Sequence, residues 1–177
     1  MPFRSSIFRL VLPLILLSAT AFTAAAQGTQ VGFGNPDHDS SLPVEVTADQ
    51  LDLQRDDGKA KFTGNVIVAQ GEMRLYGDVV DVRYGDNAAG ATEIEWVHAA
   101  GNVTLFNGTE AAEGDDAVYT VDTAIVVMTG DVLVTQGDNT MSGDRLTVNV
   151  DTGIGQMEGR VKVLFNPEDR PERARPQ

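Results

Sequence analysis

The stretch "FTGNVIVAQG" at residues 62–71 sets the pattern for the whole chain, because the chain repeats it three more times. The related stretches are "AAGNVTLFNG" at 99–108, "MTGDVLVTQG" at 128–137 and "MEGRVKVLFN" at 157–166. After each glycine the apolar residues alternate with their neighbours, as Val66 and Val68 do in the first stretch. A period of two with β-branched residues is typical of half-buried β-strands.

A second class of segment lies between these stretches. It reads "YGDVVDV", "EGDDAVY" and "SGDRLTV", and each of its glycines (Gly77, Gly114 and Gly143) follows a glycine of the first class by 13 residues. The result is a 29-residue repeat with one eight-residue insertion near 83–96. Self-similarity at a fixed period indicates layers that bury their apolar faces against one another. The apolar phase slips by one residue at the second glycine, which predicts a bulge or a corner.

These observations predict an all-β fold. Eight segments, each bent at its glycine or at Ala48, give about sixteen short strands in two sheets that face each other across one apolar interior. We expect a jelly-roll-like antiparallel fold or a β-solenoid stack. The first-class glycines fall on the inward phase, so we expect them at a narrow edge where the two sheets converge.

The N-terminus has the features of a secretory signal peptide. Arg4 and Arg9 precede an apolar run, and Ala24 and Ala26 precede a predicted cleavage before Gln27. The alternative is a retained membrane anchor, but the apolar core at 10–17 is far shorter than the roughly 20 residues that span a bilayer. We therefore predict a signal peptide at 1–26, a flexible lead-in at 27–43, a folded domain at 44–165 and a flexible charged tail at 166–177.

Composition and charge exclude several classes of function. Without residues 1–26, which hold two arginines and no acidic residue, 11 basic and 26 acidic residues remain, a net charge of −15. We therefore expect no nucleic-acid partner. There is no cysteine, and His38 and His98 are isolated, so the sequence predicts no catalytic residue, no metal site and no cofactor. Asp78, Asp115 and Asp144 follow glycines and suit turns better than calcium ligation.

The candidate functional residues are the inward apolar side chains of successive layers. They are Phe62, Val66, Val68, Leu75, Val80, Val82, Val103, Leu105, Tyr119, Met128, Val132, Val134, Met141, Leu146, Val148, Met157, Val161 and Val163. One interpretation is a packed core, which any folded sheet needs. The other is a groove that is open along one side and accepts a long apolar ligand, with the methionines as an adaptable lining.

The repeated "GNVxV" and "GDxxxxxV" segments behind a signal peptide resemble the OstA-type domain of the lipopolysaccharide-transport proteins over about Leu42 to Phe165. The resemblance implies a twisted, V-shaped β jelly roll (a β-taco) whose groove shelters the acyl chains of lipid A. It also implies head-to-tail self-association and partners at both membranes, an inner-membrane LptC-like protein and the N-terminal domain of an outer-membrane LptD-like protein. The edge-strand residues implied as contacts are Val44, Val46, Leu51 and Leu53 at one end and Val161, Val163 and Phe165 at the other.

The function that we predict is that of a non-enzymatic periplasmic protein that binds lipopolysaccharide and bridges the two membranes. The predicted cleavage site favours the soluble bridging component over the membrane-anchored relative. Two alternatives stay open: a related carrier of another envelope lipid, and a structural or carbohydrate-binding β-stack with a closed core. The acidic surface is unusual for a protein that handles an anionic glycolipid, so we expect acyl burial to outweigh attraction to the headgroup.

Overall fold

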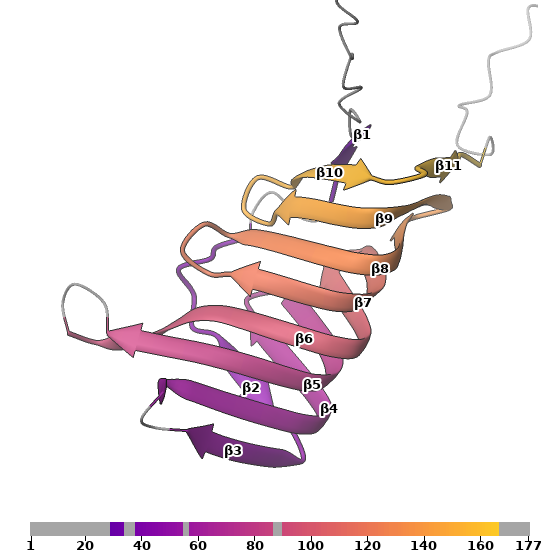
Figure 1. Cartoon of the computed structure of the whole chain (residues 1–177). Coiled ribbons are helices and arrows are strands. Elements are labelled where there is room, and N and C mark those ends of the chain that lie inside the picture. Colours follow the sequence, from indigo (N-terminus) through magenta and orange to yellow (C-terminus); the bar gives the residue numbers. More distant parts are fainter. Residues whose placement is uncertain (1–28, 34–37, 55–56, 87–89, 167–177) are drawn as a thin grey trace, which may run out of the picture.

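The computed structural model describes residues 29–33, 38–54, 57–86 and 90–166. The described part confirms the all-β prediction: its eleven strands form one antiparallel sheet in the order β1-β10-β9-β8-β7-β6-β5-β4-β2, with β3 also paired to β4 and β11 to β9 (Figure 1). The strands are β1 (Thr29–Gly32), β2 (Glu45–Thr47), β3 (Gln50–Gln54), β4 (Lys59–Gln70), β5 (Met73–Asp86), β6 (Thr92–Asn107), β7 (Glu110–Thr120), β8 (Ile125–Gln136), β9 (Asn139–Asn149), β10 (Ile154–Glu158) and β11 (Lys162–Leu164).

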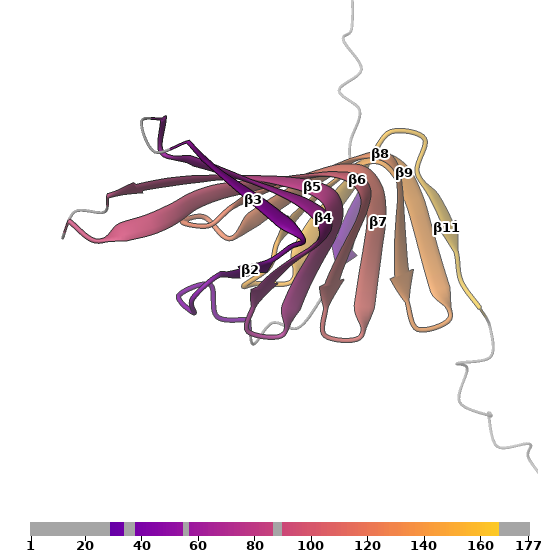
Figure 2. The same ribbon diagram turned by 90° about the horizontal axis from the view of Figure 1, so that it is seen from below.

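The sheet is folded along its length into an open V. The strands bend where the two sides meet, so each of β4 to β9 contributes one half to each side (Figure 2). We call the side that contains β1, β3 and β10 arm one, and the side that contains β2 and β11 arm two. Fewer separate strands occur than the predicted sixteen, because these six run continuously through the bend. Among the described residues, no helix has the length and apolarity of a membrane span.

The bend is made by the repeated glycines of the first class. Gly64, Gly101, Gly130 and Gly159 have positive φ angles of 81°, 78°, 85° and 77°, and the residue after each is also left-handed. The pairing register shifts by one residue at each of these points, for example between Thr63 and Val66 on β4. The extra residue is a β-bulge, which bends a strand and changes its twist. A corner is therefore present, but its extra residue lies beside the first-class glycine, not at the second-class glycine where the phase slip predicted it.

The neighbour of each corner glycine differs from the prediction. A Cβ atom on Gly101 would lie 2.7 Å from Oδ2 of Asp78, so the close contact is an aspartate at the bend instead of the opposite sheet. Asn102 then donates a hydrogen bond to Asp78 at 2.7 Å, and Asn65 bonds to Asp49 in the same way at 2.8 Å. In the last repeat Arg160 donates to Asp144 at 2.9 Å. These aspartates therefore fix the corner, which agrees with the expected structural role.

One repeat breaks this pattern of pairs. Asp131 follows Gly130 at the position that Asn65 and Asn102 occupy, and a Cβ on Gly130 would meet the carboxylate of Asp115. We expect Asp131→Asn to raise the free energy of unfolding by about 0.5–1 kcal/mol, because the amide would donate where a second carboxylate repels. Asn also tolerates the left-handed φ of 42° at this position. The midpoint of chemical denaturation measures the change. The reverse substitution Asn102→Asp should destabilise by a similar amount, and a stabilising Asn102→Asp would contradict the explanation.

The lead-in differs from its prediction as a flexible segment. Within residues 27–43, β1 pairs with β10 through Val31 and Gly155, and Val31 and Phe33 are buried in the core. The amide of Phe33 also donates to the carbonyl of Gly153 at 2.7 Å. Two apolar side chains at alternate positions are enough to hold a short edge strand against the core. The glycines and prolines around them make this strand hard to predict from the sequence. The predicted signal peptide and residues 167–177 of the predicted tail lie outside the described residues.

Candidate functional site

The predicted inward residues do gather between the two arms. One apolar cluster contains most of them as buried side chains, with Phe62, Met141 and Val161 packed against it. Val163 is half-buried in β11 and is not among the cluster members. The cluster extends further than the candidate set, since it also includes Phe33, Met73 and Val126. The apolar interior is therefore continuous from β10 to β4.

The side chains of this interior have almost no contact with solvent in the described structure. Val68, Leu105 and Val134 are all 0 % exposed. The small residues Ala99, Ala112 and Ala117 are also fully buried, and they narrow the space between the arms. These inward side chains are therefore shielded from solvent.

On arm two, the row of inward apolar side chains in each strand ends at an amide side chain in three of the repeats. Gln70, Asn107 and Gln136 each stand six residues after a corner glycine, in the same inward phase as the valines before them. Gln70 and Asn107 are 1 % and 0 % exposed. Neither Oδ1 nor Nδ2 of Asn107 has a hydrogen-bond partner among the described residues. The sequence analysis missed these residues, although continuing the period of two by one more step finds them.

Residues 38–44, which lead into β2, lie at the open side of the V (Figure 1). We call them the crossing chain. Near β1, Gln136 donates to the carbonyl of Gly32. Nearer β2, the Nε2 atom of Gln70 donates to the carbonyls of Ser40 and Leu42 at 2.6 and 2.8 Å. Two of the three amides therefore donate to backbone carbonyls, one at the end of β1 and one in residues 40–42.

Gln70 is also tied to the opposite arm. The hydroxyl of Tyr119 on β7 donates to Oε1 of Gln70 at 2.6 Å. Burial raises the pKa of Tyr119 well above its ordinary value, and the charge of Asp151 adds to this shift. The hydroxyl therefore stays protonated at any ordinary pH and remains a donor to Gln70.

A hollow lies beside residues 40–44. It has a volume of about 690 Å³ and separates residues 40–44 from the ends of β6 and β7, where Ile94 and Val121 lie. Val44, Ile94 and Val121 also pack against the buried cluster, so the apolar wall of the hollow continues into the interior. Acidic side chains, Glu93 and Asp122, complete its lining.

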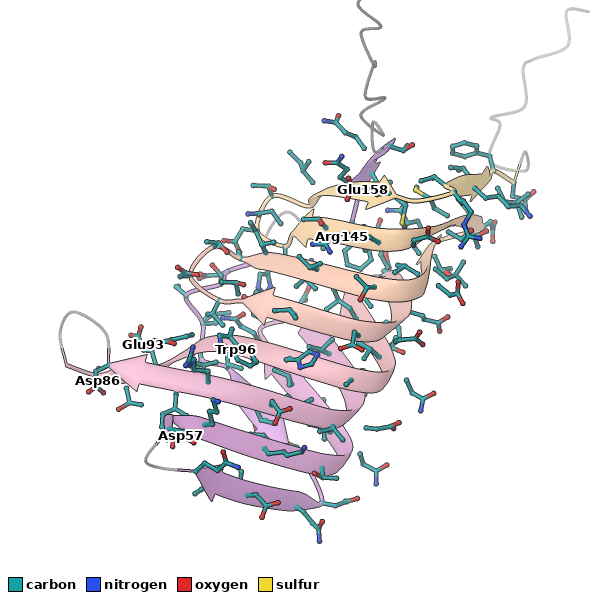
Figure 3. The ribbon with its side chains drawn as sticks, viewed as in Figure 1. Asp57, Asp86, Glu93, Trp96, Arg145 and Glu158 are labelled. Carbon is teal, nitrogen blue, oxygen red and sulfur yellow. The ribbon has the colours of Figure 1, made fainter. Side chains whose placement is uncertain are left out.

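A smaller hollow of about 300 Å³ lies on the outer face of arm one. It is lined by Trp96, His98, Val118 and Thr120, and Trp96 lies on the face of β6 that is turned to the viewer (Figure 3). His98 is hydrogen-bonded to Asp116 on the neighbouring strand. This hollow faces away from the apolar interior. Among the described residues, no group of three or more metal-ligating side chains could hold a metal ion.

The predicted edge strands lie at the margins of the sheet. Within the part of the chain that the structure describes, β2 and β3 each pair only with β4, and β11 pairs only with β9. Apolar side chains are exposed at both ends: Leu51 and Leu53 are 50 % and 54 % exposed, and Leu164 and Phe165 are 61 % and 74 % exposed. β10 is different because β1 covers it.

Comparison with known proteins assigns the family. Residues 45–154 match the family described as "LptA/(LptD N-terminal domain) LPS transport protein". The chain belongs to this family. It is a family of lipopolysaccharide-transport proteins, not one defined by a catalytic activity.

One solved structure and one relative are also similar to this chain. The structure is similar to that of LptH, the LptA-homologous periplasmic component of the lipopolysaccharide-transport device of Pseudomonas aeruginosa. The TM-score is 0.65 and the identity 23 %, covering 73 % of this chain and 99 % of LptH. An uncharacterized protein of Rhizobium meliloti (strain 1021) is 30 % identical over 101 residues, which is 55 % of this chain and 54 % of that protein. The match therefore spans about half the length of that relative.

Proposed function

We propose that this LptA-like protein is a periplasmic carrier that shelters the acyl chains of lipopolysaccharide between its two arms. The observation that carries the proposal is the continuous apolar cluster in an unclosed sheet, in a chain of a lipopolysaccharide-transport family. The signal peptide predicted at 1–26 would deliver the protein to the periplasm, the compartment of the LptH relative.

The charge of the protein favours acyl burial as the main source of affinity. The net charge of the full sequence is −13, so anionic headgroups gain little from the surface as a whole. Each methylene group removed from water contributes about 0.8 kcal/mol, so a chain of about a dozen carbons can gain up to roughly 10 kcal/mol. Even a fraction of that gain outweighs the repulsion of a phosphate group that stays in solvent.

The bridging part of the proposal rests on the edge strands. Unpaired backbone groups at a sheet margin are templates for adding a strand from another chain. We propose that β2 and β3 at one end, and β11 at the other, pair with a second copy or with the LptC-like and LptD-like partners. The exposed Leu51, Leu53 and Phe165 would then be covered in the assembly.

Site-specific photo-crosslinking tests the acyl-binding proposal. A benzophenone amino acid in place of Phe62, which packs against the cluster, should crosslink to purified lipopolysaccharide. The matched control is Phe106, an aromatic residue of the same size that is 40 % exposed between the buried Leu105 and Asn107. We expect at least a fivefold higher yield from position 62. Equal yields, or none from position 62, would refute an internal lipid site.

One observation favours a second candidate, a structural β-stack with a closed core. The cluster between the arms is already sealed without a ligand, since Val68 and Leu105 are 0 % exposed. On this alternative the hollow beside residues 40–44 is incidental. The absence of any crosslink from position 62, in a protein that still unfolds cooperatively, would support it.

A further inference from the structure

The crossing chain joins the free ends of both arms through its residues Ser40–Val44, which we call the clasp. On the side of arm one, Ser40 binds Asp151 in the turn after β9: its hydroxyl donates to Oδ2 at 2.8 Å and its amide to Oδ1 at 3.2 Å. On the side of arm two, Gln70 binds the carbonyls of Ser40 and Leu42. The clasp therefore spans the open side of the V.

The clasp is held by polar contacts at Ser40 and Leu42, and by Val44 at its end, which is half-buried and packs against the cluster. Ser41, Leu42 and Pro43 are exposed, and Leu42 keeps 42 % of its surface in solvent. A hydrogen bond of this kind contributes about 0.5–1.5 kcal/mol net, because water replaces it when it breaks. Opening the clasp therefore costs much less than unfolding the sheet. Val31 and Phe33, by contrast, anchor β1 in the core.

The hollow under the clasp has the size for a hydrocarbon chain and an apolar part of its lining, while Ser40, Ser41, Thr92, Glu93 and Asp122 make the rest of the lining polar. Its volume of about 690 Å³ lies within the range of roughly 300–1,000 Å³ typical of small-molecule sites. Leu42 and Val44 form one side, and Ile94 and Val121 form the other. The acidic Glu93 and Asp122 disfavour a phosphate here, so the chemistry selects an uncharged tail over a headgroup.

We propose that this hollow is the portal through which a single acyl chain passes into the interior, and that the clasp Ser40–Val44 swings aside to admit it. The inference rests on the proposed function, because it concerns the route to the same interior. It explains how a cluster that is sealed in the free protein can take up a ligand. The clasp leaves Gln70 when it opens, so the amide side chains at the mouth become free to bind polar groups of the lipid.

A disulfide across the clasp tests this proposal. The chain has no cysteine, and the Ser40 hydroxyl contacts the Asp151 carboxylate, so Ser40→Cys with Asp151→Cys puts one cysteine on each side of that contact. Titration of free thiols shows that the disulfide has formed before the assay. With the crosslinker at position 62, we expect the oxidised protein to yield at least fivefold less lipopolysaccharide adduct than the same protein after reduction. The matched control is Val127→Cys with Thr147→Cys, a facing pair on β8 and β9 between buried neighbours that point inward. Its yield should not change on reduction.

A second variant opens the clasp instead of locking it. Ser40→Ala removes the hydroxyl donor to Asp151 from a partly exposed position, so we expect the variant to fold, with a denaturation midpoint close to that of the unmodified protein. We expect the initial rate of adduct formation to rise about two- to fivefold. Equal yields from the oxidised and reduced lock would overturn the portal while leaving the acyl-binding proposal intact. Loss of the adduct in the protein without added cysteines would instead refute the acyl-binding proposal.

Discussion

Gly101→Ala is expected to lower the free energy of unfolding by about 2–4 kcal/mol, a large effect for one added methyl group. Gly101 has a φ of 78°, where an alanine costs about 1–2 kcal/mol. The new Cβ would also lie 2.7 Å from Oδ2 of Asp78, which already accepts a hydrogen bond from Asn102. Asp78 must then move and weaken that bond, which adds about 1 kcal/mol or more. Chemical denaturation followed by circular dichroism measures the loss.

Two comparisons separate the causes of this loss. Gly137 has a φ of 57° with nothing within 4 Å of its Cβ position, so Gly137→Ala reports the backbone strain alone and should cost about 1 kcal/mol. Asp78→Ala together with Gly101→Ala removes the clash, so the double variant should be less destabilised than the sum of the singles by at least about 1 kcal/mol. Strict additivity would show that Asp78 is not the group that excludes a side chain at Gly101.

The corner shows what the sequence makes predictable. The fixed spacing of the glycines predicts where the strands bend. The alternating apolar residues after each glycine predict a strand and show which of its faces is buried. The extra residue of the bulge lies between Thr63 and Val66 on β4, and the phase slip in the sequence lies near Gly77, which pairs with Val66 from β5. The sequence did not predict why a glycine is required at the first-class positions such as Gly101. Its neighbour Asp78 belongs to a different strand, and only the pairing register brings the two together.

The mouth of the V shows what the sequence alone does not reveal. Gln70 meets Ser40, 30 residues earlier, and Tyr119, 49 residues later. No local pattern encodes such contacts, because they depend on how the two arms face each other. The polar residue at the sixth position after the corner glycine marks the end of the apolar strip. Its partners become known only when the crossing chain is placed.

β1 is the clearest departure from the sequence prediction, and it leads to the last expected result. Phe33 is 1 % exposed, so Phe33→Ala should cost about 3 kcal/mol, the lower part of the range for a buried phenylalanine. The cost stays near that lower bound because β1 pairs only with β10 and can detach once its anchor is lost. The measurement is the denaturation midpoint, together with hydrogen exchange of the β10 amides. Detachment should speed the exchange of the amides that face β1 and leave those of β6 unchanged.

Leu42→Ala is the matched comparison, since it lies in the same lead-in but keeps 42 % of its surface exposed. We expect it to cost less than 1 kcal/mol, because little apolar area returns to water. A much larger loss of stability for Phe33→Ala than for Leu42→Ala would mean that the chain is firmly held at β1 and weakly held at the clasp. The proposed portal requires this difference, because only the clasp end has to open. Equal and small losses would mean that Phe33 is no anchor, and the crossing chain would then be free to leave as a whole.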